Sequence, residues 1–226
     1  MADSVTGRAG AEVPFYLSIS GNIGVGKSTL CRQVGEALGW PTYYEPVDDN
    51  PYLEDYYRDM PRWAFHLQIY FLSKRFEVQK DIIQHGRSAV QDRTIYEDVE
   101  IFAPVLHRRG AMDTRDYENY REVFRNMVSF LRPPDLILYL RCAPETALAR
   151  IAARGRECEK TIPADFIADL HAAYEAWIPR ATDICPVHTV DTDRVDLRDP
   201  DAFAELLALI RRHHADKQRA AREVGS

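Results

Sequence analysis

Short apolar runs alternate with longer segments of helical periodicity along most of this 226-residue chain. The apolar runs predict five strands, at residues 13–19, 41–44, 88–91, 135–140 and 186–190. Apolar residues spaced three and four positions apart predict helices at residues 27–38, 50–59, 62–85, 96–107, 114–131, 144–154, 163–178 and 200–214. This alternation predicts an α/β fold in which helices cover both faces of a parallel sheet. Ligands bind such folds beyond the carboxyl ends of the strands.

The segment between the first strand and the first helix carries the most informative motif. It matches G-x-x-x-x-G-K-[ST], in which successive backbone N–H groups and a helix N-terminus bind phosphate. Lys27 can reach the β- and γ-phosphates of a nucleotide, and the Ser28 hydroxyl can ligate Mg²⁺. We therefore predict an ATP site with Mg²⁺, formed by Gly21, Asn22, Ile23, Gly24, Val25, Gly26, Lys27, Ser28 and Thr29.

Carboxylates follow two of the other predicted strands. Glu45 follows the second strand, where it could act as the general base that takes a proton from an attacking hydroxyl. Asp92 follows the third strand, where it could hold Mg²⁺ opposite Ser28 or take over the role of the base. Arg93 could bridge the acceptor hydroxyl and the phosphoryl group in transfer.

Two further features predict ligand contacts. Arg150 and Arg154 are four residues apart on one helix face, and Arg156 follows Gly155, which ends that helix. Three arginines at a helix end beside a polar loop predict a lid that stabilises charge on the transferring phosphoryl group. Gln68 lies in an apolar stretch, where a buried amide needs hydrogen-bond partners that the edge of a nucleobase would supply.

Composition narrows the function further. The net charge of −6 argues against a nucleic-acid polymer as partner, and no apolar run reaches the length of about 18 residues that a membrane span needs. Residues 1–12 lack the apolar core of a secretory signal. The four cysteines form no C-x-x-C pair, which argues against a zinc site or a disulfide framework and favours a reducing cytoplasmic location.

Taken together, these motifs resemble the deoxyribonucleoside kinase family. The resemblance covers residues 14–195 and rests on an ordered set of matches: the phosphate loop, Glu45-Pro46-Val47, residues 63–68, Asp92-Arg93-Thr94 with Tyr96, Asp98 and Phe102, Arg150, Arg154-Gly155-Arg156 and Ile162-Pro163. Residues 45–52 and 67–76, with Leu67 before Gln68, are most similar to bacterial deoxyadenosine/deoxyguanosine kinases.

The resemblance implies a three-layer P-loop kinase fold with an Arg-rich lid, and it implies roles for particular side chains. Glu45 would activate the 5′-hydroxyl of a deoxynucleoside, and Arg93 would contact that hydroxyl and restrain Glu45. Tyr57 and Glu159 would hold the sugar 3′-hydroxyl. In the base pocket Leu67 and Gln68 would contact the base, with Gln68 reading its edge. Phe102 would stack on the base, and Arg75 would pair with Asp98. Residues 191–195, with Asp193, would border the adenine of ATP.

Residues 1–12 are small and polar and predict a disordered arm, and residues 216–226 predict a flexible tail. The resemblance implies a kinase domain between them, at residues 13–215. It further suggests a homodimer through helices such as 62–85 and 114–131.

Three other functions compete with a purine deoxynucleoside kinase. A thymidylate kinase-like enzyme would need basic residues where Glu45 stands, because a carboxylate repels a substrate that already carries a phosphate. A non-catalytic nucleotide sensor should lack the base or the lid arginines. A pyrimidine-preferring kinase is disfavoured because a charged Arg75–Asp98 pair suits the extended polar edge of a purine, and buried polar groups left unpaired reject an analogue strongly.

Overall fold

The computed structural model describes residues 12–45, 50–156 and 159–224. The predicted arm at residues 1–12 lies outside this range except for Glu12. Pro46 and Val47, which follow the predicted base, also lie outside it.

Five parallel strands form one sheet, as the sequence predicted, and their order in the sheet is β2-β3-β1-β4-β5. The strands are β1 (Tyr16–Gly21), β2 (Thr42–Tyr43), β3 (Ala89–Asp92), β4 (Leu136–Arg141) and β5 (Val187–Asp191). β1 is central, and its Ile19 pairs with Asp92 of β3 and with Leu138 of β4. Because these strands run in the same direction, the segments that follow β1 and β3 meet at one edge of the sheet.

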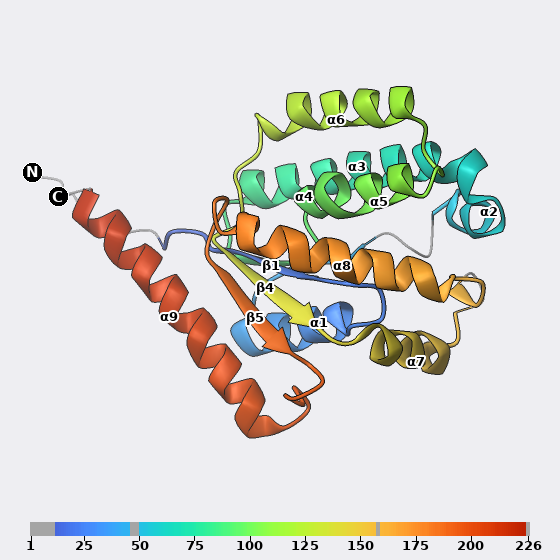
Figure 1. Cartoon of the computed structure of the whole chain (residues 1–226). Coiled ribbons are helices and arrows are strands. Elements are labelled where there is room, and N and C mark those ends of the chain that lie inside the picture. The colour runs from blue at the N-terminus through green and yellow to red at the C-terminus, as the bar shows by residue number, and fades with distance from the viewer. Residues whose placement is uncertain (1–11, 46–49, 157–158, 225–226) are drawn as a thin grey trace, which may run out of the picture.

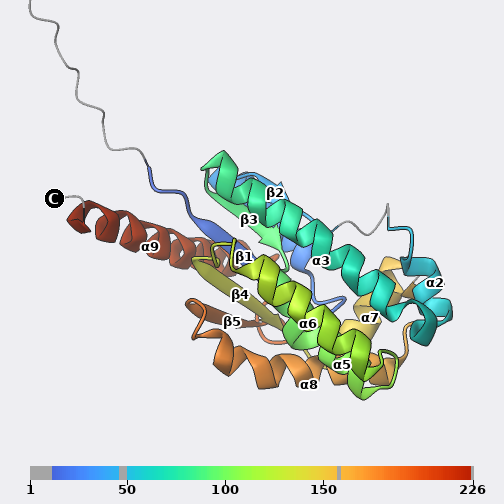
Figure 2. The ribbon, with the colours of Figure 1, turned by 90° about the horizontal axis from the view of Figure 1, so that it is seen from above.

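Helices cover both faces of the sheet, which gives the predicted three layers (Figures 1 and 2). They are α1 (Lys27–Leu38), α2 (Leu53–Arg58), α3 (Met60–His85), α4 (Ile95–Glu97), the π-helical turn η1 (Asp98–Phe102), α5 (Ala103–Arg108), α6 (Thr114–Val128), α7 (Pro144–Arg154), α8 (Ala164–Ala181) and α9 (Pro200–Val224). The side chains of alternate β4 residues point to opposite faces of the sheet. Ile137 and Tyr139 pack with α3 and α8, whereas Leu138 and Leu140 pack with α1 and α9.

The segment predicted as one helix at residues 96–107 is divided by the π-helical turn η1. There the N–H of Ala103 donates to the carbonyl of Asp98, five residues earlier. Pro104 explains the interruption, because it has no N–H and its ring crowds the carbonyl of Glu100. The turn presents Asp98 and Phe102 to the same cavity.

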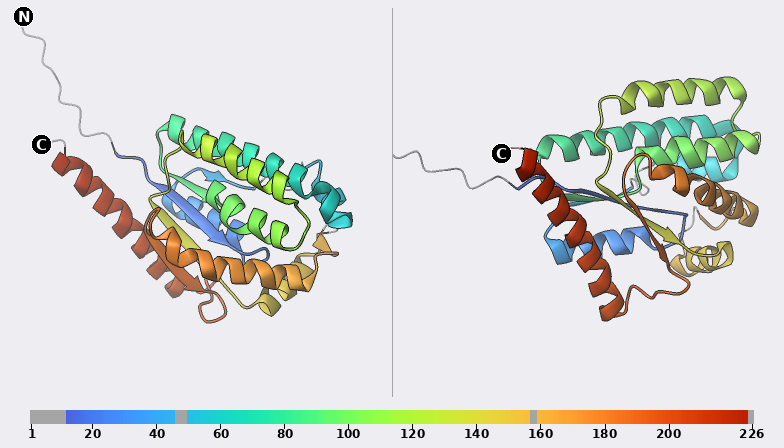
Figure 3. Two further views of the ribbon diagram at one scale, coloured as in Figure 1. Left: turned by 45° about the horizontal axis from the view of Figure 1, so that its top comes forward. Right: turned by 60° about the vertical axis from the view of Figure 1, so that its left-hand side comes forward.

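At the C-terminus α9 continues to Val224, beyond the helix predicted at residues 200–214, and includes most of the segment 216–226 that was predicted as a tail. Lys217 Nζ donates to Pro14 O at 2.6 Å and to Asp135 Oδ2 at 2.7 Å. Gln218 exchanges two hydrogen bonds with the backbone of Val13, at 2.7 and 3.0 Å. These contacts hold the end of α9 against the segment that enters β1 (Figure 3). None of the helices within the described ranges has the length and apolar character needed to cross a membrane.

We expect Lys217→Met to lower the free energy of unfolding by about 1–3 kcal/mol, because it leaves Asp135, whose side chain is 19% exposed, without this cation. In a chain of this size that corresponds to a fall in Tm of several degrees, about 2–4 °C per kcal/mol. Thermal unfolding followed by circular dichroism measures it, with the exposed Arg219→Met as the matched control. Equal Tm values for the two variants would show that this end of α9 is not anchored through Lys217.

Candidate active site

The loop between β1 and α1 has the geometry of a preformed phosphate site. Its three glycines have positive φ angles, 145° at Gly21, 83° at Gly24 and 106° at Gly26. A Cβ at Gly24 would lie 2.6 Å from the carbonyl of Ala147 in α7, so this close approach requires glycine. Lys27 Nζ donates to the carbonyl of Asn22 at 2.8 Å, and Asn22 Nδ2 donates to Ile167 of α8 at 2.9 Å. These contacts hold the loop open for an anion.

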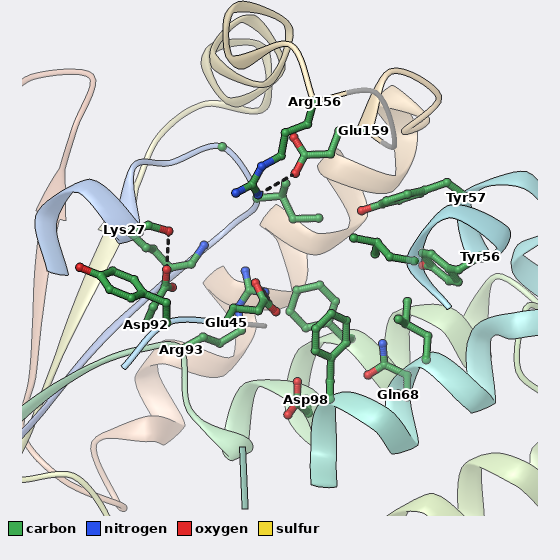
Figure 4. A pocket seen from close by; sticks show the side chains of 18 of the residues that line it. Lys27, Glu45, Tyr56, Tyr57, Gln68, Asp92, Arg93, Asp98, Arg156 and Glu159 are labelled. Carbon is green, nitrogen blue, oxygen red and sulfur yellow. Dashed lines mark hydrogen bonds and ion pairs between the residues drawn. The ribbon is translucent and has the colours of Figure 1, made fainter. Parts of the chain in front are cut away.

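Beside this loop lies a cavity of 310 Å³ (Figure 4). It contains every side chain that the sequence predicted to bind the substrate: Glu45, Tyr57, Leu67, Gln68, Arg75, Arg93, Asp98, Phe102 and Glu159. Part of the phosphate loop and the lid arginines Arg154 and Arg156 line the same cavity. The cavity therefore joins a phosphate-binding end to a partly apolar end that could enclose a small molecule.

Glu45 lies in the middle of the cavity beside Arg93 (Figure 4), and its carboxylate also contacts Arg75. Its Oε1 accepts from Arg75 Nη2 at 2.5 Å, and its two oxygens accept from Arg93 Nη1 at 3.1 and 3.3 Å. Burial would raise the pKa of Glu45, but Arg93, Arg75 and Lys27 lower that pKa to about 2. The carboxylate is therefore ionised across the physiological pH range and can accept a hydrogen bond from a hydroxyl group.

Arg93 has φ 67°, the only non-glycine residue of the described chain with a positive φ. Such a conformation is costly and persists only where surrounding contacts fix it. Arg93 Nη2 donates to the carbonyl of Gly21 at 3.1 Å, and the guanidinium lies 4.5 Å from the ring centroid of Phe102. The strained backbone thus aims the guanidinium between the phosphate loop and Glu45.

The partly apolar end of the cavity contains buried polar atoms that have no hydrogen-bond partner among the described residues. Arg75 Nε lies 2.7 Å from Asp98 Oδ2, although the two groups are not aligned for a hydrogen bond. Within the described residues, Gln68 Oε1, Arg75 Nη1 and Asp98 Oδ2 are buried and accept or donate no hydrogen bond. Burial raises the pKa of Asp98 to about 7, against the opposing effect of Arg75 and Arg93. A ligand with its own donors and acceptors would satisfy these groups.

Ser28 and Asp92 meet where the sequence predicted a metal. Ser28 Oγ donates to Asp92 Oδ2 at 2.5 Å, and Asp92 Oδ1 is buried without a partner among the described residues. Hard oxygen donors beside a phosphate loop fit Mg²⁺, which takes one or two protein ligands and completes its shell with phosphates and water. In the described part of the chain no cluster of three His, Cys, Asp or Glu side chains could hold a metal.

The structure separates the three predicted lid arginines. Arg154 and Arg156 pair with Glu159 at 2.6 and 3.4 Å over the main cavity. Arg150 instead donates to the carbonyl of Val25 and to Thr192, at 2.9–3.2 Å. It lies in a second cavity of 470 Å³ on the other side of the phosphate loop, which Thr29 and Asp193 also line.

Several residues of the site were missed by the sequence analysis. Leu53, Tyr56, Phe71 and Phe166 line the main cavity, but their spacing could not be distinguished from ordinary core packing. Glu97 lies behind Arg93, at an ion-pair distance of 3.5 Å. The pattern Thr94-x-x-Glu97 signals a capping box, which the structure contains, and that signal gives no indication of a contact with Arg93.

A preformed phosphate loop, a carboxylate in the adjoining cavity and a cover of arginines define a phosphotransferase of the P-loop class. The family model for deoxynucleoside kinases matches residues 17–213, and the chain belongs to this family.

Individual relatives agree with the family model. A deoxyadenosine kinase of Dictyostelium discoideum is 42% identical over 192 residues, which cover 85% of this chain and 77% of that protein. A deoxyadenosine/deoxycytidine kinase of Bacillus subtilis is 43% identical over 183 residues, covering 80% of this chain and 84% of that protein. The solved structure of a deoxyadenosine kinase from M. mycoides with the products dCMP and dCDP has a TM-score of 0.79 at 31% identity. The match covers 87% of this chain and 99% of that chain.

Proposed function

We propose that this protein transfers the γ-phosphoryl group of ATP to the 5′-hydroxyl of a purine deoxynucleoside, a salvage reaction that yields the monophosphate. The observation that carries this proposal is the position of Glu45. An ionised carboxylate lies beside the phosphate loop, where a nucleotide kinase would need cations for its substrate's phosphate. A neutral hydroxyl is the acceptor that this arrangement favours.

In the proposed reaction Glu45 accepts the proton of the 5′-hydroxyl while the hydroxyl oxygen attacks the γ-phosphorus. The bond between that phosphorus and the β,γ-bridging oxygen breaks, and ADP leaves. Arg93 donates to the acceptor oxygen and orients Glu45. Lys27, Arg154 and Arg156 stabilise charge on the phosphoryl oxygens, where fixed cations act most strongly. Tyr57 and Glu159 hold the sugar 3′-hydroxyl.

Bound Mg²⁺ would neutralise charge between the β- and γ-phosphates. Ser28 and Asp92 would hold it, and their hydrogen bond supports this role for Asp92 over that of a second base. The second cavity supports a site for the adenine of ATP, because Arg150 and Asp193 line it directly behind the phosphate loop. The donor and the acceptor would then approach the loop from opposite sides.

Gln68, Arg75 and Asp98 each have a buried polar atom without a hydrogen bond among the described residues, which supports recognition of a base with adjacent donors and acceptors. Adenine and cytosine share one such edge, an amino group beside a ring-nitrogen acceptor. Deoxycytidine is therefore a second candidate substrate, and the name of the Bacillus subtilis relative favours it.

An ATP-coupled assay with deoxyadenosine, deoxyguanosine, deoxycytidine, thymidine and dTMP as separate acceptors tests the proposal. We expect turnover with the purine deoxynucleosides and none with dTMP. Turnover with dTMP alone would show that the protein is a nucleotide kinase and that Glu45 is not the general base. If deoxycytidine gives the highest turnover, the proposed reaction stands, but the preferred substrate is deoxycytidine and not a purine deoxynucleoside.

Replacing the buried pair by Arg75→Met with Asp98→Ala is expected to lower the purine-to-thymidine ratio of kcat/KM by at least about tenfold. Both residues change together, because one buried charge without the other would destabilise the fold. The matched control is Arg58→Met with Asp55→Ala, an exposed pair on α2. If both double variants rank the substrates as the wild type does, the pair does not select the base.

We also propose a cytosolic homodimer. The outer surface supports the dimer, because α3 and α6 lie side by side there (Figure 2) and Phe130 beyond α6 is 79% exposed. The free thiols of Cys31 and Cys142 support a reducing compartment. Sedimentation velocity at micromolar concentration distinguishes a dimer from a monomer.

A further inference from the structure

The buried carboxylate of Glu97 has no part in the reaction proposed above, although it lies directly behind the reacting groups. Its side chain is 0% exposed. Glu97 Oε1 accepts from Ser20 Oγ and Thr94 N at 2.8 Å, and Oε2 accepts from Tyr174 OH at 2.6 Å and Gly21 N at 3.4 Å, with Arg93 Nε 3.5 Å away. A buried carboxylate that accepts this many hydrogen bonds is held in one position.

Two of these contacts reach the groups that handle the substrates. Gly21 begins the phosphate loop, where ATP would bind, and Arg93 contacts Glu45, where the deoxynucleoside would bind. The Glu97 carboxylate therefore contacts both the ATP side and the deoxynucleoside side of the site. Arg93 also donates to the carbonyl of Gly21. Glu97, Gly21 and Arg93 therefore form a closed triangle.

The charge of Glu97 matters as well as its hydrogen bonds. Arg93 is buried in a left-handed backbone conformation and faces three other charged neighbours, Lys27, Glu45 and Asp92. Burial opposes the charge on Arg93, while Glu45 and Glu97 raise the pKa of its guanidinium. Without Glu97, Arg93 would keep only Glu45 and Asp92 as carboxylate neighbours and would hold Glu45 more tightly.

We propose that Glu97 is a positioning residue for phosphoryl transfer, which holds Arg93 and Gly21 in one frame so that the acceptor hydroxyl and the donor phosphate are aligned. The proposal rests on the proposed function. Displacement of a positioning group by about 1 Å can cost about 10²-fold in rate, because transfer depends on a near-attack geometry.

The test compares Glu97→Gln with Tyr174→Phe as the matched control. Glu97→Gln keeps the shape and removes the charge that faces Arg93. Tyr174→Phe removes a donor to the same carboxylate and leaves the charge in place. We expect Glu97→Gln to lower kcat by about 10- to 100-fold. Its KM for the deoxynucleoside should stay within about threefold of the wild-type value. Tyr174→Phe should lower Tm while kcat stays within about threefold of the wild type.

A double-mutant cycle with Arg93→Ala shows whether Glu97 acts through Arg93. If it does, Glu97→Gln lowers kcat by a much smaller factor in the Arg93→Ala background than in the wild type, because only its longer contact with Gly21 N is then lost. If Glu97→Gln lowers kcat by the same factor with and without Arg93, the proposal is wrong. It is also wrong if the kcat of Glu97→Gln lies within about twofold of the wild-type value. If Glu97→Gln does not fold, the cycle is run with Glu97→Asp, which keeps the charge and shortens the reach, under the same criteria. A wild-type protein that phosphorylates no nucleoside would instead reject the proposed function.

Discussion

Glu45→Gln is expected to lower kcat by about 10²–10⁴-fold, the range that general-base catalysis contributes. The amide keeps the size of the side chain but cannot accept the proton of the 5′-hydroxyl. The dissociation constant of the deoxynucleoside should change by less than about fivefold, because sugar and base contacts come from other residues. Steady-state kinetics with ATP and deoxyadenosine, together with calorimetric titration of the nucleoside, measure the two quantities.

Glu54→Gln on α2 provides the matched control, since that carboxylate is 80% exposed and pairs only with Arg58 among the described contacts. Its kcat should equal that of the wild type. A kcat of Glu45→Gln within about threefold of the wild type would transfer the base role to Asp92. In that case Asp92→Asn should cause the larger loss at saturating Mg²⁺, whereas a metal role predicts that added Mg²⁺ restores part of its rate.

The pKa of Glu45 also predicts how stability depends on pH. Because the folded protein holds that pKa at about 2, below the ordinary value of 4.5, the ionised carboxylate stabilises the fold above pH 4.5. This contribution is lost as the pH falls from 4.5 through about 2. Glu45→Gln should therefore flatten the acid limb of a plot of stability against pH.

The sheet and the phosphate loop could be predicted because local signals agree there. Apolar runs mark the strands. The glycines at positions 21, 24 and 26 allow the positive φ angles of the loop, and Gly24 also allows its close approach to α7. The sequence could also predict that Asp92 and Ser28 lie close together, as they do, because parallel strands bring their carboxyl ends to one edge of the sheet.

What could not be predicted depends on contacts between distant segments. Arg75 was assigned to the base pocket, but its hydrogen bond to Glu45 joins side chains thirty residues apart on separate elements. Arg150 and Arg154 share a helical spacing, yet Arg150 turns to Thr192, a partner that helical periodicity does not reveal. The end of α9 has the composition of a polar tail, and only its contacts with the segment before β1 and with Asp135 explain its order.

These distant contacts link the two ends of the cavity. Arg75 contacts both Asp98, where the base would bind, and Glu45, where the hydroxyl would lose its proton. We therefore expect a base that engages Arg75 to change the hydrogen bonding of Glu45, so that the choice of substrate would affect turnover as well as binding.

Lys27→Ala is expected to reduce phosphoryl transfer below detection, a loss of at least about 10³-fold. Lys27 is buried at the end of the phosphate loop, and its Nζ lies within hydrogen-bond distance of the loop carbonyl at Asn22. No other lysine lines the main cavity as described, so no second ammonium group can replace it. Deoxynucleoside binding should be retained, because Gln68 and the Arg75–Asp98 pair remain. Lys74→Ala, at an exposed position on α3, is the matched control and should leave kcat unchanged.

The pH dependence of ATP use provides a second readout of Lys27. Burial and the nearby Arg93 lower the pKa of Lys27 to about 8, although Asp92 and Glu45 oppose this. The ammonium form exists below that pKa, so kcat/KM for ATP should fall as the pH rises through about 8, by up to about tenfold per pH unit. Lys27→Arg keeps a cation at this position over the whole range, because a guanidinium does not lose its proton, and any activity that this variant retains should lack the decline. A wild-type profile that stays flat to a pH of about 9.5, or a Lys27→Ala variant with more than about a tenth of the wild-type kcat, would show that phosphate binding depends on the backbone of the loop and not on this ammonium group.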